Sequence, residues 1–194
     1  MIAGHFGFAA GVKAKERSAP LWALMLATQW LDVVFVPLFA AGIEKIQPVA
    51  GTADGAYGES IIYADYTHSL VGAAVLAIAF GGALALRYGR RNGVVLGLVV
   101  MSHWLLDLLV HRSDLPILPG NRGDLPRLGL GLWQSPVASA AVELALVAVG
   151  TWMYAVAARE VAGPDPSLAR RARLCASLVG VTGVIVLALN LAGV

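Results

Sequence analysis

The sequence predicts an all-α fold: a polytopic membrane helical bundle of about five transmembrane helices, with a short half-inserted or interfacial helix at the N-terminus. Of the 194 residues, 58% are hydrophobic and 13% are charged, and the mean hydropathy is +0.74. A soluble domain carries about 25% charged residues. The apolar residues are also gathered in runs of about 20, the length that crosses a bilayer as a helix. One membrane domain over residues 1–194 accounts for the whole chain.

The N-terminal residues 1 to 12 are apolar and precede the basic residues Lys13, Lys15 and Arg17. At about 1.5 Å per residue they form a helix roughly 15 Å long, which is too short to cross a bilayer. A secretory signal places its positive charges before the apolar run, so we expect no cleavage here.

The first span is predicted over residues 21 to 43, which contain Asp32 and Pro37. Proline removes one hydrogen bond of a helix, so this sequence predicts a kink beside Asp32. Polar segments containing glycine predict loops over residues 44 to 65 and 112 to 135. The other apolar runs predict four further spans, over residues 66 to 86, 93 to 110, 136 to 158 and 174 to 194.

Basic residues are distributed unequally between the two ends of these spans. By the positive-inside rule, the end with more lysine and arginine is cytoplasmic. We therefore expect a cytoplasmic N-terminus, with both long loops and the C-terminus outside. Ten of the 14 basic residues belong to the cytoplasmic end: Lys13, Lys15, Arg17, Arg87, Arg90, Arg91, Arg159, Arg170, Arg171 and Arg173.

Composition excludes two classes of site. The single cysteine, Cys175, cannot form an intrachain disulfide or a cysteine-based metal cage. The net charge is +2, and the basic residues lie in short clusters beside apolar runs. This placement indicates membrane topology and no nucleic-acid partner. Histidines and carboxylates remain as candidate metal ligands.

Polar residues within the predicted spans converge at one depth. His103, Asp107 and His111 follow at steps of four, so they share one helix face. Counted from the cytoplasmic end at about 1.5 Å per residue, Asp32 and His103 lie near the midplane. Asp107 and Glu143 lie slightly further out, His68 further still, and His111 at the outer rim.

Ionisable groups at this depth carry an insertion cost, about 2.5 to 3.5 kcal/mol for an aspartate, and a shared cation would offset it. Mixed imidazole and carboxylate ligands suit Zn²⁺, with Mn²⁺ or Fe²⁺ as alternatives. Other interpretations stay open: His103 and Asp107 could be a hydrogen-bonded pair, and His68 could anchor a helix end. His5 reaches the layer only if residues 1 to 12 pack into the bundle, which Gly4, Gly7 and Gly11 would permit.

Four short patterns resemble one known family. They are Gly4-His5, Asp32 in a hydrophobic segment, Thr67-His68-Ser69, and SHWLLD from Ser102 to Asp107. Over residues 1 to 135 the chain resembles the YdjM-like family of bacterial inner-membrane proteins, which are described as metal-dependent hydrolases. More remotely it is similar to zinc-dependent phospholipase C and single-strand nucleases, in which an HxxxD helix motif contributes to a multi-zinc site.

The resemblance implies an inner-membrane location and metal-ligand roles for His5, Asp32, His68, His103 and Asp107. Two features of the family pattern are absent. Val34 stands where the family often has a second aspartate, and YADYTHS lacks the arginine of the family's HRGxTHS.

The leading functional hypothesis is a metal-dependent hydrolase with its site in the outer half of the bilayer. It would act on a phosphoester of a lipid or lipid-linked compound, with Glu143 or Asp65 accepting the proton. One of Arg112, Arg122 and Arg127 would replace the missing arginine in binding phosphate. The alternatives are a small transporter that uses the same cluster as a proton or metal path, and an accessory subunit in which the polar layer only holds helices together.

Overall fold

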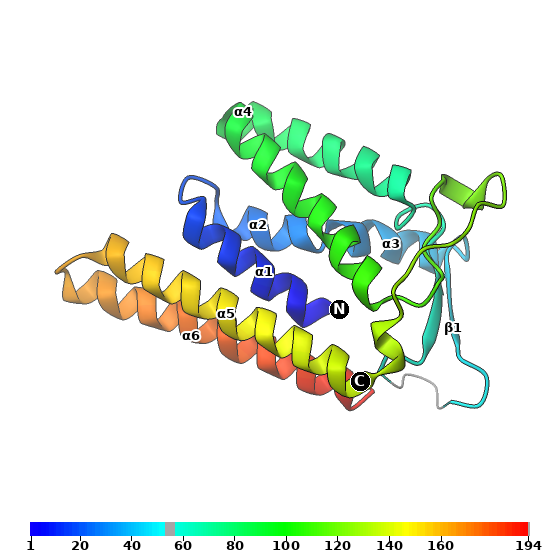
Figure 1. The fold of residues 1–194 in the computed structure, drawn as a ribbon. Coiled ribbons are helices and arrows are strands. Elements are labelled where there is room, and N and C mark those ends of the chain that lie inside the picture. Colours follow the sequence, from blue (N-terminus) through cyan, green and yellow to red (C-terminus); the bar gives the residue numbers. More distant parts are fainter. Residues whose placement is uncertain (53–56, 194) are drawn as a thin grey trace.

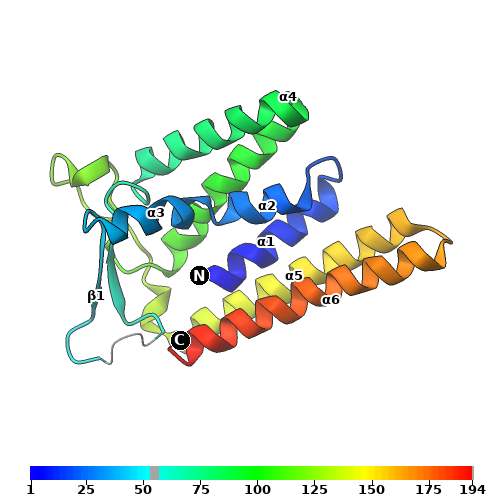
Figure 2. The same ribbon diagram turned by 180° about the vertical axis from the view of Figure 1, so that it is seen from behind.

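The structure is a computed structural model that describes residues 1–52 and 57–193, and it is 70% helical (Figures 1 and 2). Helices α4, α5 and α6 are each long and apolar enough to cross a membrane, and the bent pair α2 and α3 would be a fourth span. The prediction of an all-α fold with helices able to cross a membrane is therefore confirmed. The helices are α1 (Ile2–Lys15), α2 (Leu21–Thr28), α3 (Trp30–Ala40), α4 (Leu70–Val110), α5 (Pro136–Ala162) and α6 (Pro166–Leu191).

Helix α1 lies inside the bundle, between α2 and α5 (Figure 1). Glycines allow this close approach: a Cβ at Gly7 would lie 2.5 Å from the backbone of Leu146, and one at Gly150 would overlap the carbonyl oxygen of Gly7. The side chain of His5 is fully buried as a result. Residues 1 to 12 therefore pack into the bundle. A role for His5 in the cluster depends on this packing.

The first predicted span is broken into α2 and α3, which meet at Gln29 with a bend of 49°. The expected cause was Pro37, but α3 continues through Pro37 to Ala40. The break lies three residues before Asp32. At this point the carbonyl oxygen of Thr28 accepts a hydrogen bond from a histidine of α4, and the Thr28 hydroxyl donates to the His5 carbonyl. Tertiary hydrogen bonds, rather than proline, accompany the bend.

Helix α4 is folded back on itself at Gly89, whose φ of 82° and ψ of 158° are not helical. Such positive φ values favour glycine. The two predicted spans over residues 66 to 86 and 93 to 110 form the two arms of α4, visible as a narrow V in Figure 1. The arms approach closely at glycines, since a Cβ at Gly81 would lie 2.6 Å from the carbonyl oxygen of Gly93.

Helices α5 and α6 form an antiparallel pair along one side of the molecule (Figures 1 and 2). Helix α6 begins earlier than predicted, at Pro166 instead of residue 174. Asp165 caps it by accepting hydrogen bonds from the amides of Ser167 and Leu168, and proline is favourable at the first helical position. The fifth predicted span extended to residue 194, which lies outside the described residues.

The segment over residues 44 to 65 was predicted as a loop, and this was wrong in part. Strands β1 (Lys45–Pro48) and β2 (Ser60–Tyr63) form an antiparallel hairpin, with Ile46 opposite Ile62. Residues 53 to 56 of this segment lie outside the described residues. The hairpin stands beside α3 at one end of the bundle (Figure 1). The α1–α2 connection, the bend of α4 and the α5–α6 connection lie at the other end, which we call the basic end because it carries the ten basic residues named above.

Candidate metal centre

All four histidines of the chain meet two aspartates near the hairpin end of the bundle. His5 comes from α1 and Asp32 from α3, while His68 precedes α4 and the others lie on its second arm or at its end. The histidines and Asp107 are at most 3% exposed, whereas the side chain of Asp32 is 40% exposed. Asp32 is therefore the most exposed member of the group. Its six members are His5, Asp32, His68, His103, Asp107 and His111.

Four ligand atoms of this group, from two histidines and two aspartates, lie close together. The Nε2 atoms of His68 and His103 are 3.3 Å apart, and Asp32 Oδ1 lies 3.4 Å and 3.7 Å from them. Asp107 Oδ2 lies 3.0 Å from His103 Nε2 and 3.7 Å from His68 Nε2. Zinc bound tetrahedrally at about 2.0–2.1 Å places neighbouring ligand atoms about 3.3 Å apart. The five distances between these side-chain atoms, 3.0–3.7 Å, are close to that spacing.

Asp107 extends the ligand set beyond these four atoms. Its Oδ1 lies 3.0 Å from His5 Nε2, and its Oδ2 lies 3.6 Å from His111 Nε2. The ring of His5 also stacks on that of His103, with centroids 3.9 Å apart. His5, His103 and Asp107 form one triad able to hold a metal ion, and Asp32, His68 and His103 form a second. Because each oxygen of Asp107 has a histidine beside it, this carboxylate can bridge two metal positions.

His103 is oriented by the break between α2 and α3. Its Nδ1 lies 2.7 Å from the carbonyl oxygen of Thr28, and a carbonyl can only accept, so Nδ1 carries the proton. In the neutral ring Nε2 then presents a lone pair to the cluster. Metal-binding histidines are typically held in this way, with the second ring nitrogen donating to a backbone carbonyl or a carboxylate.

His68 is oriented by a relay through Thr67 to Glu44. The Thr67 hydroxyl donates to the buried Glu44 carboxylate at 2.9 Å, so it accepts from His68 Nδ1 at 2.8 Å. Nε2 of His68 again faces the cluster without a proton in the neutral ring. Two bare Nε2 atoms 3.3 Å apart repel each other, and a cation between them, either a metal ion or a proton, removes that repulsion.

His111 was expected at the outer rim, where histidines are commonly solvated, but it is buried, with 2% of the residue exposed. The loop after α4 folds back over it: the amide of Gly131 donates to its carbonyl, and Trp133 packs on its ring at 4.4 Å. Its Nδ1 lies 2.9 Å from Asp114 Oδ1, so Nε2 again points toward Asp107. Asp114 is itself fixed by the amide of Ile62 in β2.

Glu143 of α5 is fully buried, and its two oxygens accept hydrogen bonds from different elements. The Gly4 amide donates to Oε2 at 3.1 Å, and the Tyr57 hydroxyl donates to Oε1 at 2.6 Å. Burial, together with the hydrogen bond to Glu143, raises the pKa of the Tyr57 phenol above its ordinary value. Tyr57 therefore remains a hydrogen-bond donor to the carboxylate at neutral pH.

Asp65, the other predicted proton acceptor, is not brought into the cluster. Its carboxylate pairs with Arg127, with N–O distances of 2.7 Å and 3.1 Å. Arg112 is likewise engaged, with Glu59 and the carbonyl of Gly58. Two of the three arginines expected to bind phosphate, Arg112 and Arg127, are therefore engaged in ion pairs with other loop residues.

A cavity of about 500 Å³ adjoins the cluster. Asp32, His68, Asp107, His111 and Glu143 line it together, so four of the six clustered residues and Glu143 face one space. Apolar side chains of α3 and of the hairpin form much of the remaining wall. No lysine or arginine of the described part of the chain lines this cavity. The apolar wall includes Phe35, Val36, Ile46, Ile62 and Trp133.

Comparisons with models of protein families, with curated proteins and with solved structures find no match for this chain. The resemblance to the YdjM-like family therefore stays a prediction that rests on the short patterns quoted above. The buried histidine and aspartate group that could hold a metal ion rests on its own geometry.

Proposed function

We propose that the protein is a membrane-embedded metal-dependent hydrolase that acts on a phosphoester of a lipid or lipid-linked compound. The observation that carries this proposal is the arrangement of imidazole and carboxylate groups around one point. The Nε2 atoms of His68 and His103 lie 3.3 Å apart, and one oxygen each of Asp32 and Asp107 lies 3.0–3.7 Å from them. The Nδ1 atom of each histidine is hydrogen-bonded away from the cluster, that of His68 to the Thr67 hydroxyl and that of His103 to the Thr28 carbonyl.

His68, His103, Asp32 and Asp107 would hold the ion, and His5 and His111 would complete the set on either side of Asp107. Zinc suits this mixture of ligands best, with Mn²⁺ or Fe²⁺ as alternatives. When bound, such an ion supplies Lewis-acid chemistry, which makes hydroxide accessible at neutral pH and withdraws charge from a phosphoryl oxygen.

Glu143 is the carboxylate proposed to accept the proton. It lines the same cavity as the cluster, and it is not one of the clustered ligands. Its Oε1 already accepts a hydrogen bond from Tyr57, which fixes the direction of that lone pair. Asp65 is not retained in this role, because its carboxylate is paired with Arg127.

The cavity wall supports a lipid-like substrate. Phe35 and Val36 of α3, together with Ile46 and Ile62 of the hairpin, offer apolar contacts beside a polar floor. Since no lysine or arginine of the described residues lines the cavity, the bound cation would supply most of the charge that balances a phosphoester. This arrangement favours one esterified phosphate with a hydrocarbon group.

Counting both arms of α4, the bent pair α2 and α3, and helices α5 and α6 gives the proposed five spans. The basic end is proposed to be cytoplasmic by the positive-inside rule. The metal centre would then lie in the outer half of the bilayer of a bacterial inner membrane. Helix α1 would be half-inserted from the cytoplasmic side.

The test is elemental analysis of protein purified without chelator, combined with a turnover assay. We expect near-stoichiometric transition metal in the wild type and its loss in the variant H103A/D107A. Phospholipid or lipid pyrophosphate in micelles should be hydrolysed, and a chelator should abolish the turnover. Absence of metal from the wild type would refute the proposal. Metal or proton flux into liposomes without turnover would favour the transporter hypothesis instead.

A further inference from the structure

A second concave site lies between α5 and α6, at the basic end of the molecule. It is a groove of about 590 Å³ that shares no lining residue with the cavity of the metal centre. Val181, Val184 and Ile185 of α6 form apolar walls, and small residues such as Gly180 leave room between the helices. The three apolar side chains are partly exposed on the surface that a membrane would cover.

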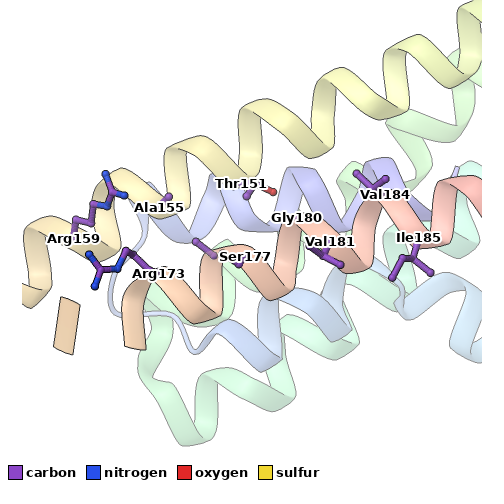
Figure 3. A pocket seen from close by; sticks show the side chains of 10 residues that line it. Thr151, Ala155, Arg159, Arg173, Ser177, Gly180, Val181, Val184 and Ile185 are labelled. Atoms are coloured by element: carbon purple, nitrogen blue, oxygen red, sulfur yellow. The ribbon is translucent and has the colours of Figure 1, made fainter. Parts of the chain in front are cut away.

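Two arginines close one end of this groove, Arg159 from α5 and Arg173 from α6 (Figure 3). Both side chains are exposed, and neither forms an ion pair within the part of the chain that the structure describes. Other arginines of the basic end behave differently, since Arg17 pairs with Glu160 and Arg91 pairs with Glu16. Two positive charges without a carboxylate partner therefore stand beside an apolar groove.

The backbone of Arg159 lies at the boundary of the hydrocarbon core and that of Arg173 about 5 Å inside it, so both guanidinium groups can reach the lipid headgroups. Helices α5 and α6 have 27 and 26 residues and are therefore about 40 Å long, so each end extends about 5 Å beyond a hydrocarbon core of about 30 Å. Arg159 is three residues from the end of α5, and Arg173 is seven residues after the start of α6. Long arginine side chains reach the interface from such positions.

We propose that this groove binds an anionic phospholipid, with its phosphate between Arg159 and Arg173 and an acyl chain along the groove. A guanidinium group recognises phosphate by two parallel hydrogen bonds, so one arginine on each helix can hold one headgroup. The negative net charge complements the two arginines, whereas a zwitterionic lipid leaves this positive charge uncompensated. The site is independent of the proposed hydrolase activity, and it would attach the α5–α6 pair to the leaflet at the basic end.

The test measures which lipid the full-length protein retains. The protein is reconstituted in nanodiscs of phosphatidylglycerol and phosphatidylcholine in equal amounts, extracted with detergent, and analysed for retained lipid by native mass spectrometry. Two basic groups near a membrane surface correspond to a preference for phosphatidylglycerol of about thirtyfold. The variant R159Q/R173Q should lose this preference. The matched control R90Q/R171Q, which removes two charges from the same end but not from the groove, should keep it.

A third variant tests the groove itself. Ser177 is exposed and lines the groove, so Ser177→Phe fills space without disturbing the helix contacts. We expect it to reduce retention of both lipids while elution volume and helical content stay unchanged. Equal loss of preference in both arginine double variants would overturn the proposal, as would full retention in Ser177→Phe. Displacement of phosphatidylglycerol by inorganic phosphate at equal concentration would assign the arginines to a free anion and would also overturn it.

Discussion

Two buried carboxylates near the hairpin end have opposite surroundings. Glu44 accepts hydrogen bonds from the amides of Tyr66 and Thr67 and from the Thr67 hydroxyl, at 2.8–3.1 Å. Asp107 instead faces imidazole nitrogens of four histidines at 3.0–3.7 Å. Both side chains are almost inaccessible to solvent. Two of the donors around Glu44 are backbone amides, whereas the contacts of Asp107 depend on where protons or cations reside.

Glu44 has the surroundings of a structural carboxylate, whereas Asp107 has those of the proposed metal ligand. A buried acid that only holds helices together is expected to resemble Glu44, because backbone donors cannot be lost. Asp107 has the surroundings of a group that shares a cation with its neighbours. The two acids are nevertheless connected, since Thr67 bonds Glu44 and His68 at the same time.

The largest effect is expected from Asp107→Asn, which keeps the shape of the side chain and removes its charge. Bound metal and turnover should both be lost, because the substituted amide is a poor ligand for a divalent cation. The matched change Glu44→Gln keeps an oxygen that accepts from the backbone amides, so metal content should persist. Elemental analysis of both variants checks this expectation. Equal loss of metal in the two would remove the distinction between the acids.

Glu143→Gln should reduce turnover by about 10²–10⁴-fold while the metal stays bound, since a carboxamide cannot accept the proton. The amide oxygen can still accept one of the bonds that Gly4 and Tyr57 donate. Tyr57→Phe serves as the control and should have a smaller effect, because it leaves the carboxylate in place. Steady-state hydrolysis in micelles provides the measurement. An active Glu143→Gln enzyme would exclude this residue as the proton acceptor.

Thr67→Val should weaken metal binding by about 10- to 100-fold, because it removes the hydroxyl that orients His68. Ser69→Ala, on the other side of His68, is the matched control. Ser69 caps α4 by accepting from the Gly72 amide, so its loss should lower stability by about 0.5–2 kcal/mol without changing metal affinity. Metal titration and thermal unfolding in detergent distinguish the two results. Unchanged affinity in Thr67→Val would contradict the relay.

The smallest effect is expected from Arg127→Gln. Its ion pair with Asp65 is partly exposed: 23% of the Arg127 side chain and 25% of the Asp65 side chain are accessible to solvent. Such pairs contribute about 0.2–1 kcal/mol to the free energy of unfolding. Thermal unfolding should change slightly and turnover should not change. A fall in turnover above tenfold would instead restore the role of Arg127 in phosphate binding that the sequence indicated.

The sequence was sufficient for the helices and for much of the cluster. Apolar runs located the spans, and depth counting brought Asp32, His103 and Asp107 together, because each of these signals is local to one helix. Residues that orient the ligands, such as Glu44 and Asp114, carried no comparable signal. Their partners depend on how the hairpin and the loop after α4 fold onto the bundle. That folding also buries His111, which helix geometry alone placed at the rim.

The break at Gln29 has a consequence for how the membrane-spanning segments move. In an unbroken helix the Thr28 carbonyl would accept from the amide four residues later, that of Asp32. Here it accepts a hydrogen bond from His103. The bond that orients His103 therefore uses the same oxygen atom that would accept from the Asp32 amide in a straight helix. Straightening this segment would free His103 to rotate and would shift Asp32 at the same time. Opening of the bend between α2 and α3 would therefore displace two of the proposed ligands, His103 and Asp32, together.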